Sequence, residues 1–406
     1  MKKKYLNNSV LIIIIYTFLL FPFIQQRTYS EVPQWIGLFY KYYALFSSTV
    51  IYVFLLIKRQ FNPMKKKQWL FWMFWLVYLF STLLNVHHQI SYVLYHAYIL
   101  LALVSFLFYA SKDHLKELLS ALSLIYGFFI LANWILFMFY PSGFYSTSSY
   151  HSGHLLGDDN AIIYVCLPGL ICIVCNSILK KEKISLFTWF LIIVTEFTLV
   201  KLWSASAVLC LSIFIVGLLY ANKTKGPKPN HVMLICFAAI IVAFFGLSTP
   251  FVSNFIVNVL HKDITLTYRT IIWKLALQYI MIKPILGHGG YFTQGHFRAT
   301  FNSWYSFPSH TPYLQMLIDG GMILLIIFCI ITFFGFKNAS KNKNSLYARV
   351  LSLGLGCMLI NYITEYSQLY HYMIIISLML NIEYKAEKQK KITKEENEYE
   401  KEIAKI

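Results

Sequence analysis

Three histidines and an arginine lie close together in an otherwise apolar chain, at His288, His296, Arg298 and His310. His310 stands in the sequence Ser-His-Thr-Pro, directly before a long apolar run. Because Thr is favoured at a helix N-cap and Pro at the first helical position, a helix is expected to begin here. The positive end of that helix disfavours an imidazolium, so His310 is expected to be neutral and able to accept a proton. The alternative is a histidine that only forms hydrogen bonds within a loop.

Two guanidinium groups belong to the same part of the sequence, Arg269 and Arg298. Guanidinium groups suit bidentate binding of phosphate or pyrophosphate oxygens. The alternative for each arginine is that its side chain snorkels to lipid headgroups. Lys274 and Lys283 are expected to make such headgroup contacts.

The sequence predicts neither a metal centre nor a cofactor site. His288 and His296 have no carboxylate or thiol at ligand spacing beside them. Gly287, Gly289 and Gly290 predict a flexible turn, because no Lys-Ser or Lys-Thr pair follows to complete a phosphate-binding loop. The 7 cysteines all fall in apolar runs, so no disulfide framework is expected.

The elements that must position these residues are predicted to be membrane helices. The chain is 58% hydrophobic and only 13% charged, which is typical of a protein embedded in lipid. The fold class expected is an all-α, polytopic transmembrane bundle, with 1–384 as a single membrane domain and 385–406 as a charged cytoplasmic tail. Twelve apolar runs are long enough to cross the hydrocarbon layer, near 9–25, 35–57, 69–86, 91–110, 118–140, 160–178, 185–200, 204–221, 232–248, 313–334, 350–365 and 369–384.

The basic residues predict the orientation of the bundle. The connections on the side of the two termini hold 27 of the 35 Lys and Arg residues. Because Lys and Arg collect in cytoplasmic loops, both termini are expected in the cytoplasm and the large loop 249–312 outside. The net charge of +18 is therefore interpreted as a topology signal, and no nucleic-acid partner is expected.

The loop 249–312 is expected to form a lid over an active site. Within it, 264–283 predicts an amphipathic helix that lies at the outer surface, with Thr270, Lys274 and Gln278 on its polar side. Proline follows at position 284 and ends this helix.

Three carboxylates fall inside or near predicted spans, at Glu196, Asp319 and Glu365. Such groups are costly in a membrane unless they are paired or hydrated. Lys201, about a turn beyond Glu196, is the expected partner of that carboxylate. Asp319 lies on the helix that follows His310 and is expected to orient a polar network. A proton-coupled transporter would carry similar residues, so the carboxylates alone do not identify a function.

Two stretches, YRTIIWKLALQYIMIKPILGHGGYF (268–292) and SHTPYLQMLIDGGMILLIIF (309–328), resemble the O-antigen ligase and polysaccharide repeat-unit polymerase family. Members of that family show an Arg followed by a Trp, then a Pro-x-x-Gly-x-Gly turn, then His-Asn-x-x-Leu before a glycine-rich stretch. The matching positions are Arg269, Trp273, Pro284, Gly287, Gly289, His310, Leu314, Gly320 and Gly321. The resemblance runs from about 150 to 335.

The sequence departs from the family pattern in two places. Thr311 stands where the family usually has Asn, and Ser204-Ala205-Ser206-Ala207 stands where many members have Ser-Arg-x-Ala. Lys201 is the basic residue nearest to this second position. The departures favour a capsule or exopolysaccharide polymerase over a lipopolysaccharide ligase.

The resemblance implies a glycosyltransferase of the bacterial inner membrane that works on the outer leaflet without metal or cofactor. Its donor would be a polyprenyl-pyrophosphate-linked oligosaccharide, and its other partners membrane lipid, a flippase and a chain-length regulator. Catalytic roles would fall to Arg269, which stabilises the departing pyrophosphate, and to His310, which accepts or orients the acceptor hydroxyl. The residues expected to bind substrate are Arg298, His296, His288, Trp304, Tyr305 and Lys201.

Trp304 and Tyr305 are expected to stack on sugar rings, and packing within the lid is the alternative. The expected function is the joining of repeat units into capsular, exopolysaccharide or O-antigen chains. One alternative is a ligase that transfers the finished glycan to another acceptor. Another is a flippase or transporter, which would place its charged residues near the bilayer midplane in broken helices related by symmetry.

Overall fold

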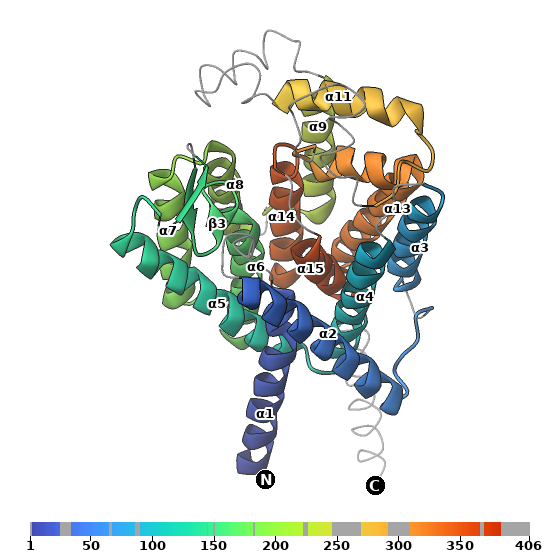
Figure 1. Ribbon diagram of the computed structural model, residues 1–406. Helices are drawn as coiled ribbons and strands as arrows, with labels where there is room; N and C mark the ends of the chain where they lie inside the picture. Colours follow the sequence, from blue (N-terminus) through green and yellow to red (C-terminus); the bar gives the residue numbers. More distant parts are fainter. Residues whose placement is uncertain are drawn as a thin grey trace.

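The protein folds as a bundle of helices, with one small sheet (Figure 1). The computed structural model describes residues 2–24, 34–64, 67–85, 90–143, 145–148, 151–181, 183–221, 226–245, 269–290, 309–365 and 369–382. Its helices are α1 (Lys2–Leu20), η1 (Phe21–Phe23), α2 (Gln34–Ile57), α3 (Trp69–Leu83), α4 (Ile90–Asp113), α5 (Leu115–Phe139), α6 (Ile162–Lys181), α7 (Leu186–Lys201), α8 (Ala205–Ala221), α9 (Pro229–Phe245), α11 (Arg269–Ile282), α13 (Pro312–Lys341), α14 (Leu346–Asn361) and α15 (Tyr370–Leu380).

Each predicted span coincides with one of these helices, and the all-α membrane bundle is confirmed in outline. Among the described residues, 5 helices are long and apolar enough to cross a membrane, namely α2, α4, α5, α6 and α13. The other helices at predicted spans are apolar but shorter, so twelve crossings stays a prediction. The protein is an integral membrane protein.

The apolar side chains divide between a packed interior and a lipid-facing surface. In α6, the apolar side chains are almost all buried, because this helix packs between α5 and α14. In α1, Val10, Leu11 and Ile14 are exposed. Lipid tails are as apolar as these side chains, so such exposure carries no hydrophobic cost in a membrane.

A small antiparallel sheet lies between α5 and α6 in the sequence. The all-α prediction missed this sheet. Its strands β1 (Tyr145–Ser148), β2 (His151–His154) and β3 (Gly157–Asp158) pair in that order. The strands are short and mostly polar, so they carry no alternating apolar pattern by which a sequence reveals a strand.

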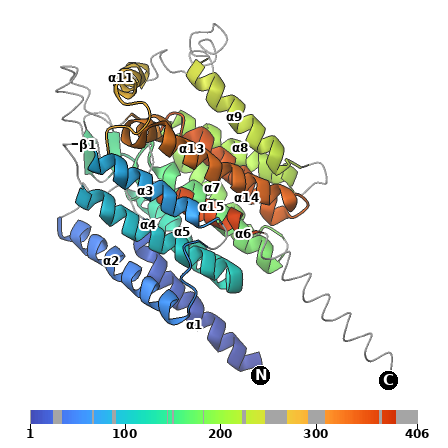
Figure 2. The ribbon, with the colours of Figure 1, turned by 90° about the vertical axis from the view of Figure 1, so that its right-hand side faces the viewer.

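Two elements run across the bundle instead of along it. In Figure 2 most helices lie side by side, whereas α11 is seen nearly end-on. The second crossing element is the first part of α13, which Gly321 separates from the rest of the helix with φ 65° and ψ −164°. This part packs beneath α11, and the remainder of α13 then turns down into the bundle (Figure 1). The predicted surface helix is therefore present, beginning at Arg269.

Lys67 and Arg349 join neighbouring elements at one end of the bundle. At this end, called the basic end here, Lys67 donates to Asn338, and Arg349 Nη1 donates to the Ala221 carbonyl at 3.0 Å. The start of α14 lies at this end, so Glu365, which follows that helix, lies at the other end with α11. We call that other end the α11 end.

Candidate active site

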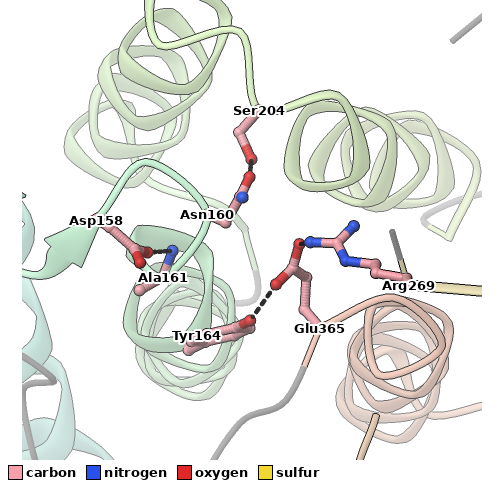
Figure 3. A network of polar contacts seen from close by, with 7 residues as sticks. All are labelled: Asp158, Asn160, Ala161, Tyr164, Ser204, Arg269 and Glu365. Atoms are coloured by element: carbon pink, nitrogen blue, oxygen red, sulfur yellow. Dashed lines mark hydrogen bonds and ion pairs between the residues drawn. The ribbon is translucent and has the colours of Figure 1, made fainter. Parts of the chain in front are cut away.

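A cluster of polar side chains lies at the α11 end and joins three distant parts of the chain (Figure 3). Arg269, the first residue of α11, forms an ion pair through Nη2 with Glu365 Oε1. Tyr164, in the first turn of α6, donates its hydroxyl to the other oxygen, Glu365 Oε2, at 3.0 Å. These three residues are called the polar cluster below.

The carboxylate of the polar cluster is buried and the guanidinium is more open. The Glu365 side chain is 5% exposed and that of Arg269 is 17% exposed. Burial of a carboxylate is costly unless it is paired and hydrogen-bonded, and Arg269 and Tyr164 together supply both interactions. The arginine is thus fixed in place while part of its surface stays accessible.

The start of α6 is tied to its surroundings beside the polar cluster (Figure 3). Asp158 Oδ1 accepts a hydrogen bond from the Ala161 amide at 2.9 Å, which satisfies a backbone donor at the helix start. Ser204, at the start of α8, donates to Asn160 Oδ1 at 2.9 Å. These contacts hold the helix that carries Tyr164.

His310 lies in a tight, strained turn before α13. Its φ of 55° is in the left-handed region, which a residue with a Cβ adopts at a cost. The turn is closed by Ser309 Oγ, which donates to the Thr311 carbonyl at 2.8 Å. Thr311 is the N-cap residue and Pro312 the first helical residue, as predicted from the sequence. The imidazole is half-buried between neighbours that are fully buried.

The expected capping bond is absent from this turn as the structure describes it. The Thr311 side chain does not cap the helix, and its buried Oγ1 has no hydrogen-bond partner among the described residues. The N-terminus of α13 therefore lacks the side-chain cap that the threonine was expected to supply. Such a helix end favours an anion nearby and disfavours a protonated imidazole.

A polar network connects this turn to Asp319, as the sequence predicted. Gln315 Oε1 accepts from the Ser309 amide at 3.3 Å, and Gln315 Nε2 donates to Asp319 Oδ1 at 2.8 Å. Tyr78 of α3 donates to Asp319 Oδ2 at 2.8 Å. The network thus runs from α3 to the residue next to His310.

The glycine-rich turn after α11 is packed against the break in α13. The amides of His288 and Gly289 donate to the carbonyls of Ile318 and Asp319 at 2.7 and 2.9 Å. In return, the Met322 amide donates to the Pro284 carbonyl at 2.8 Å. We call these two segments, 284–289 and 318–322, the glycine junction. The turn supplies the hydrogen-bond partners that the broken helix lacks.

Glycine is required at the junction because backbone meets backbone there. Gly287 has a φ of 69°, and a Cβ on it would lie 2.6 Å from both Gly321 N and Ile318 O. Gly321 also has a positive φ, and a Cβ on it would overlap the Ile285 carbonyl. The predicted turn is present, and at Gly287 the close approach of the two backbones and the positive φ account for the glycine.

His288 is held against α11. Its Nε2 lies 2.9 Å from the Tyr279 carbonyl, which can only accept, so Nε2 carries the proton. The two rings lie with their centroids 3.8 Å apart. Burial raises the pKa of the Tyr279 phenol to about 12, so this phenol stays neutral. The contact of His288 with substrate stays a prediction.

The predicted pairing of Glu196 with Lys201 is wrong. Glu196 accepts a hydrogen bond from Ser212 of α8 at 2.7 Å, and Lys201 Nζ lies 5.6 Å from the centre of the Phe197 ring. Residues five apart point to different sides of a helix, whereas neighbours on one face are three or four apart. Lys201 is exposed at the end of α7, and its contact with substrate stays a prediction.

Arg269 begins α11, and His310 lies two residues before α13, the helix against which α11 packs. Four other predicted site residues lie outside the described residues, namely Arg298, His296, Trp304 and Tyr305. No group of three or more His, Cys, Asp or Glu side chains suited to a metal occurs in the part of the chain that the structure describes.

Sequence reasoning did not foresee the partners of Arg269. Glu365 was recognised as a carboxylate near a membrane span, but its partner could not be predicted, because Arg269 lies 96 residues away in the sequence. Tyr164 was missed entirely, since a tyrosine at the start of an apolar helix is an ordinary boundary residue. Only the folded chain brings the three together.

Comparison with known proteins agrees with the motifs in this region. Residues 161–329 match the family model described as O-antigen ligase. No curated protein matches the chain. The matched residues include Tyr164, Arg269 and His310, and they cover α6 to the middle of α13. The resemblance noted in the sequence is thus confirmed over residues 161–329, where this integral membrane protein matches the O-antigen ligase family.

Proposed function

We propose that the protein is a glycosyltransferase that joins polyprenyl-pyrophosphate-linked oligosaccharide repeat units into capsular, exopolysaccharide or O-antigen chains. The observation that carries this proposal is the polar cluster, in which a buried carboxylate fixes an arginine at one end of an apolar bundle. A lipid-linked pyrophosphate holds its charge near the membrane surface, where such an arginine can meet it. The family match over residues 161–329 supports the same class of substrate.

Arg269 is proposed to stabilise the leaving group. A guanidinium has five N–H donors, and the ion pair with Glu365 engages Nη2. The donors on the other nitrogens are proposed to bind pyrophosphate oxygens, while Glu365 holds the guanidinium plane in position. Donors fixed in advance contribute more to a transition state than donors that must first be oriented.

His310 is proposed to handle the acceptor. During transfer, the acceptor hydroxyl oxygen bonds to the anomeric carbon of the donor sugar, and the bond from that carbon to the pyrophosphate oxygen breaks. The bonding pair leaves with the pyrophosphate, beside Arg269. The hydroxyl proton passes to the imidazole of His310, which the helix start at Pro312 keeps neutral, and then to solvent.

The remaining predicted residues complete the proposed site. Arg298 and Lys201 add positive charge for the pyrophosphate, and His288 and His296 add hydrogen bonds to the glycan. Trp304 and Tyr305 are proposed to stack on sugar rings. No metal or nucleotide is required in this scheme, because the donor arrives activated and the pyrophosphate is a good leaving group.

We propose that the α11 end faces the outside of a bacterial inner membrane and that both termini are cytoplasmic. The concentration of Lys and Arg at the basic end supports this orientation. A test uses Ile285→Cys at the α11 end and Asn344→Cys at the basic end, both exposed positions. Native cysteines give little background, since six of the seven are buried. An impermeant maleimide should label the first variant in intact cells and the second only after permeabilisation; the reverse pattern overturns the orientation.

The proposed reaction is tested with purified protein and a synthetic lipid-linked repeat unit, with chelator present and no nucleotide. A ladder of longer glycans on the lipid supports the polymerase. Transfer of one block to a different acceptor, such as a lipid A core, would instead identify a ligase. Movement of the lipid across a vesicle membrane without bond formation would identify a transporter. In cells, a flippase and a chain-length regulator are the proposed partners.

A further inference from the structure

A second polar site lies between α3, α4 and the first part of α13. It is a half-open pocket of about 80 Å³. One water needs about 10–15 Å³ of such space, so the pocket has room for several waters, about the size of one sugar ring. It is distinct from the polar cluster, since neither Arg269 nor Glu365 lines it.

The walls of the pocket are aromatic. Trp75 and Tyr78 lie on the α3 side with ring centroids 5.4 Å apart, and Tyr92 and His96 lie on the α4 side with centroids 4.2 Å apart. Tyr370 closes a third side. The C–H faces of a pyranose ring pack well on flat aromatic surfaces, which also offer polar edges to hydroxyl groups.

The polar groups of the pocket have hydrogen-bonding capacity left for a ligand. Asp319 is buried and holds bonds from Tyr78 and Gln315, one to each carboxylate oxygen. A carboxylate can accept about four hydrogen bonds, so sites for further donors remain. His96 Nδ1 is hydrogen-bonded to the Tyr370 hydroxyl, 2.9 Å away. The other ring nitrogen, Nε2, makes no hydrogen bond to a described residue.

The charge of the pocket argues against a phosphate ligand. Among the described residues that line it, none is Lys or Arg, so the lining offers an anion no ammonium or guanidinium group. A neutral ligand rich in hydroxyl groups matches both the aromatic walls and the acceptors. The pocket therefore differs in chemical preference from Arg269, which suits an anion.

The pocket is linked to the segment that carries His310. Pro312 lines it and lies two residues from His310, and the hydrogen bonds through Gln315 connect Asp319 with Ser309. We propose that this pocket binds the terminal sugar of the acceptor glycan and thereby brings the attacking hydroxyl to His310. The acceptor role rests on the proposed function, whereas sugar binding itself does not.

The binding test needs no transfer reaction. Full-length protein in lipid nanodiscs is mixed with methyl glycosides of common hexoses and N-acetylhexosamines, and contact is measured by saturation-transfer NMR, which detects weak ligands. The variants are Asp319→Asn and Tyr92→Ala. The matched control is Tyr98→Ala on the same helix, because Tyr98 contacts Thr49 of α2 at 2.9 Å and does not line the pocket.

We expect at least one glycoside to bind to the wild type and to Tyr98→Ala, and to bind about tenfold more weakly to both pocket variants. Thermal unfolding of Asp319→Asn, which keeps the side-chain shape, shows whether that variant is folded. Absence of glycoside binding to the wild type overturns the inference, as does undiminished binding to folded Asp319→Asn. Glycan elongation without glycoside binding would overturn the sugar-binding role of the pocket and leave the proposed function standing. Glycoside binding without elongation would support the pocket and contradict the proposed function.

Discussion

The polar cluster and the glycine junction both contain residues of the family motif, but they work in different ways. In the polar cluster, side chains from α6, α11 and the segment after α14 meet around one buried carboxylate. In the junction, backbone groups meet directly, and two glycines leave the space for this contact. Motif residues therefore divide into those that perform chemistry and those that shape the chain around it.

This division predicts that substitutions in the two regions fail differently. Substitutions in the junction should prevent the protein from folding. Substitutions in the polar cluster should leave the protein folded but reduce its activity.

Gly321→Ala should prevent stable folding. An added Cβ overlaps the Ile285 carbonyl, and the positive φ adds backbone strain, so we expect a loss of about 4 kcal/mol or more in unfolding free energy. Thermal unfolding and gel filtration in detergent measure this loss. The control is Gly127→Ala in α5, where a Cβ meets nothing within 4 Å. A well-folded, active Gly321→Ala protein would show that the junction is looser than described.

Arg269→Ala should reduce glycan elongation by about 100-fold or more, the usual effect of losing one fixed transition-state donor. It should also lower stability, because Glu365 would stay buried without its partner. Elongation of the lipid-linked repeat is measured per folded molecule. Lys274→Ala, an exposed position on the same helix, is the control and should keep near-normal activity. Elongation at wild-type level by Arg269→Ala would exclude Arg269 from the reaction.

Tyr164→Phe should have an intermediate effect. It removes one hydrogen bond to a charged acceptor, worth about 1.5–3 kcal/mol, so elongation should fall about tenfold or more while the protein remains folded. The matched control is Tyr42→Phe, because Tyr42 is exposed on α2. Equal activity of the two variants would mean that Tyr164 does not position Glu365.

Lys201→Ala should have the smallest effect. Its ammonium is exposed and its nearest described contact is a ring, so its attraction for a diphosphate is screened by salt. We expect a loss of about threefold or less, which disappears at high ionic strength. A loss as large as that of Arg269→Ala, unaffected by salt, would make Lys201 an equal partner in anion binding.

The sequence predicted the elements well because their signals are local. Apolar runs located the helices of the bundle, and the Ser-His-Thr-Pro stretch located the start of α13 at Pro312. The interfacial helix was recognised from the polar spacing of Lys274 and Gln278, both of which are exposed. Each of these inferences needs only residues within a few turns of one another.

The sequence could not predict contacts between distant residues. Glu365 and Arg269 are 96 residues apart, and Tyr164 is 201 residues from Glu365, so no spacing rule connects them. The break in α13 was missed for a related reason. Gly320-Gly321 lies in an apolar run that reads as a continuous helix, and the break is stable only because another turn supplies its hydrogen bonds.

The most direct test of the proposed chemistry is the double variant Arg269→Gln with Glu365→Gln. A neutral amide pair of similar shape can preserve the contact and avoid leaving a buried charge alone, so the protein should unfold near the wild-type temperature. If Arg269 stabilises the leaving pyrophosphate, this folded protein should elongate the lipid-linked repeat about 100-fold more slowly or worse. If it elongates the repeat at close to the wild-type rate, the ion pair is only structural and the proposed role of Arg269 is contradicted.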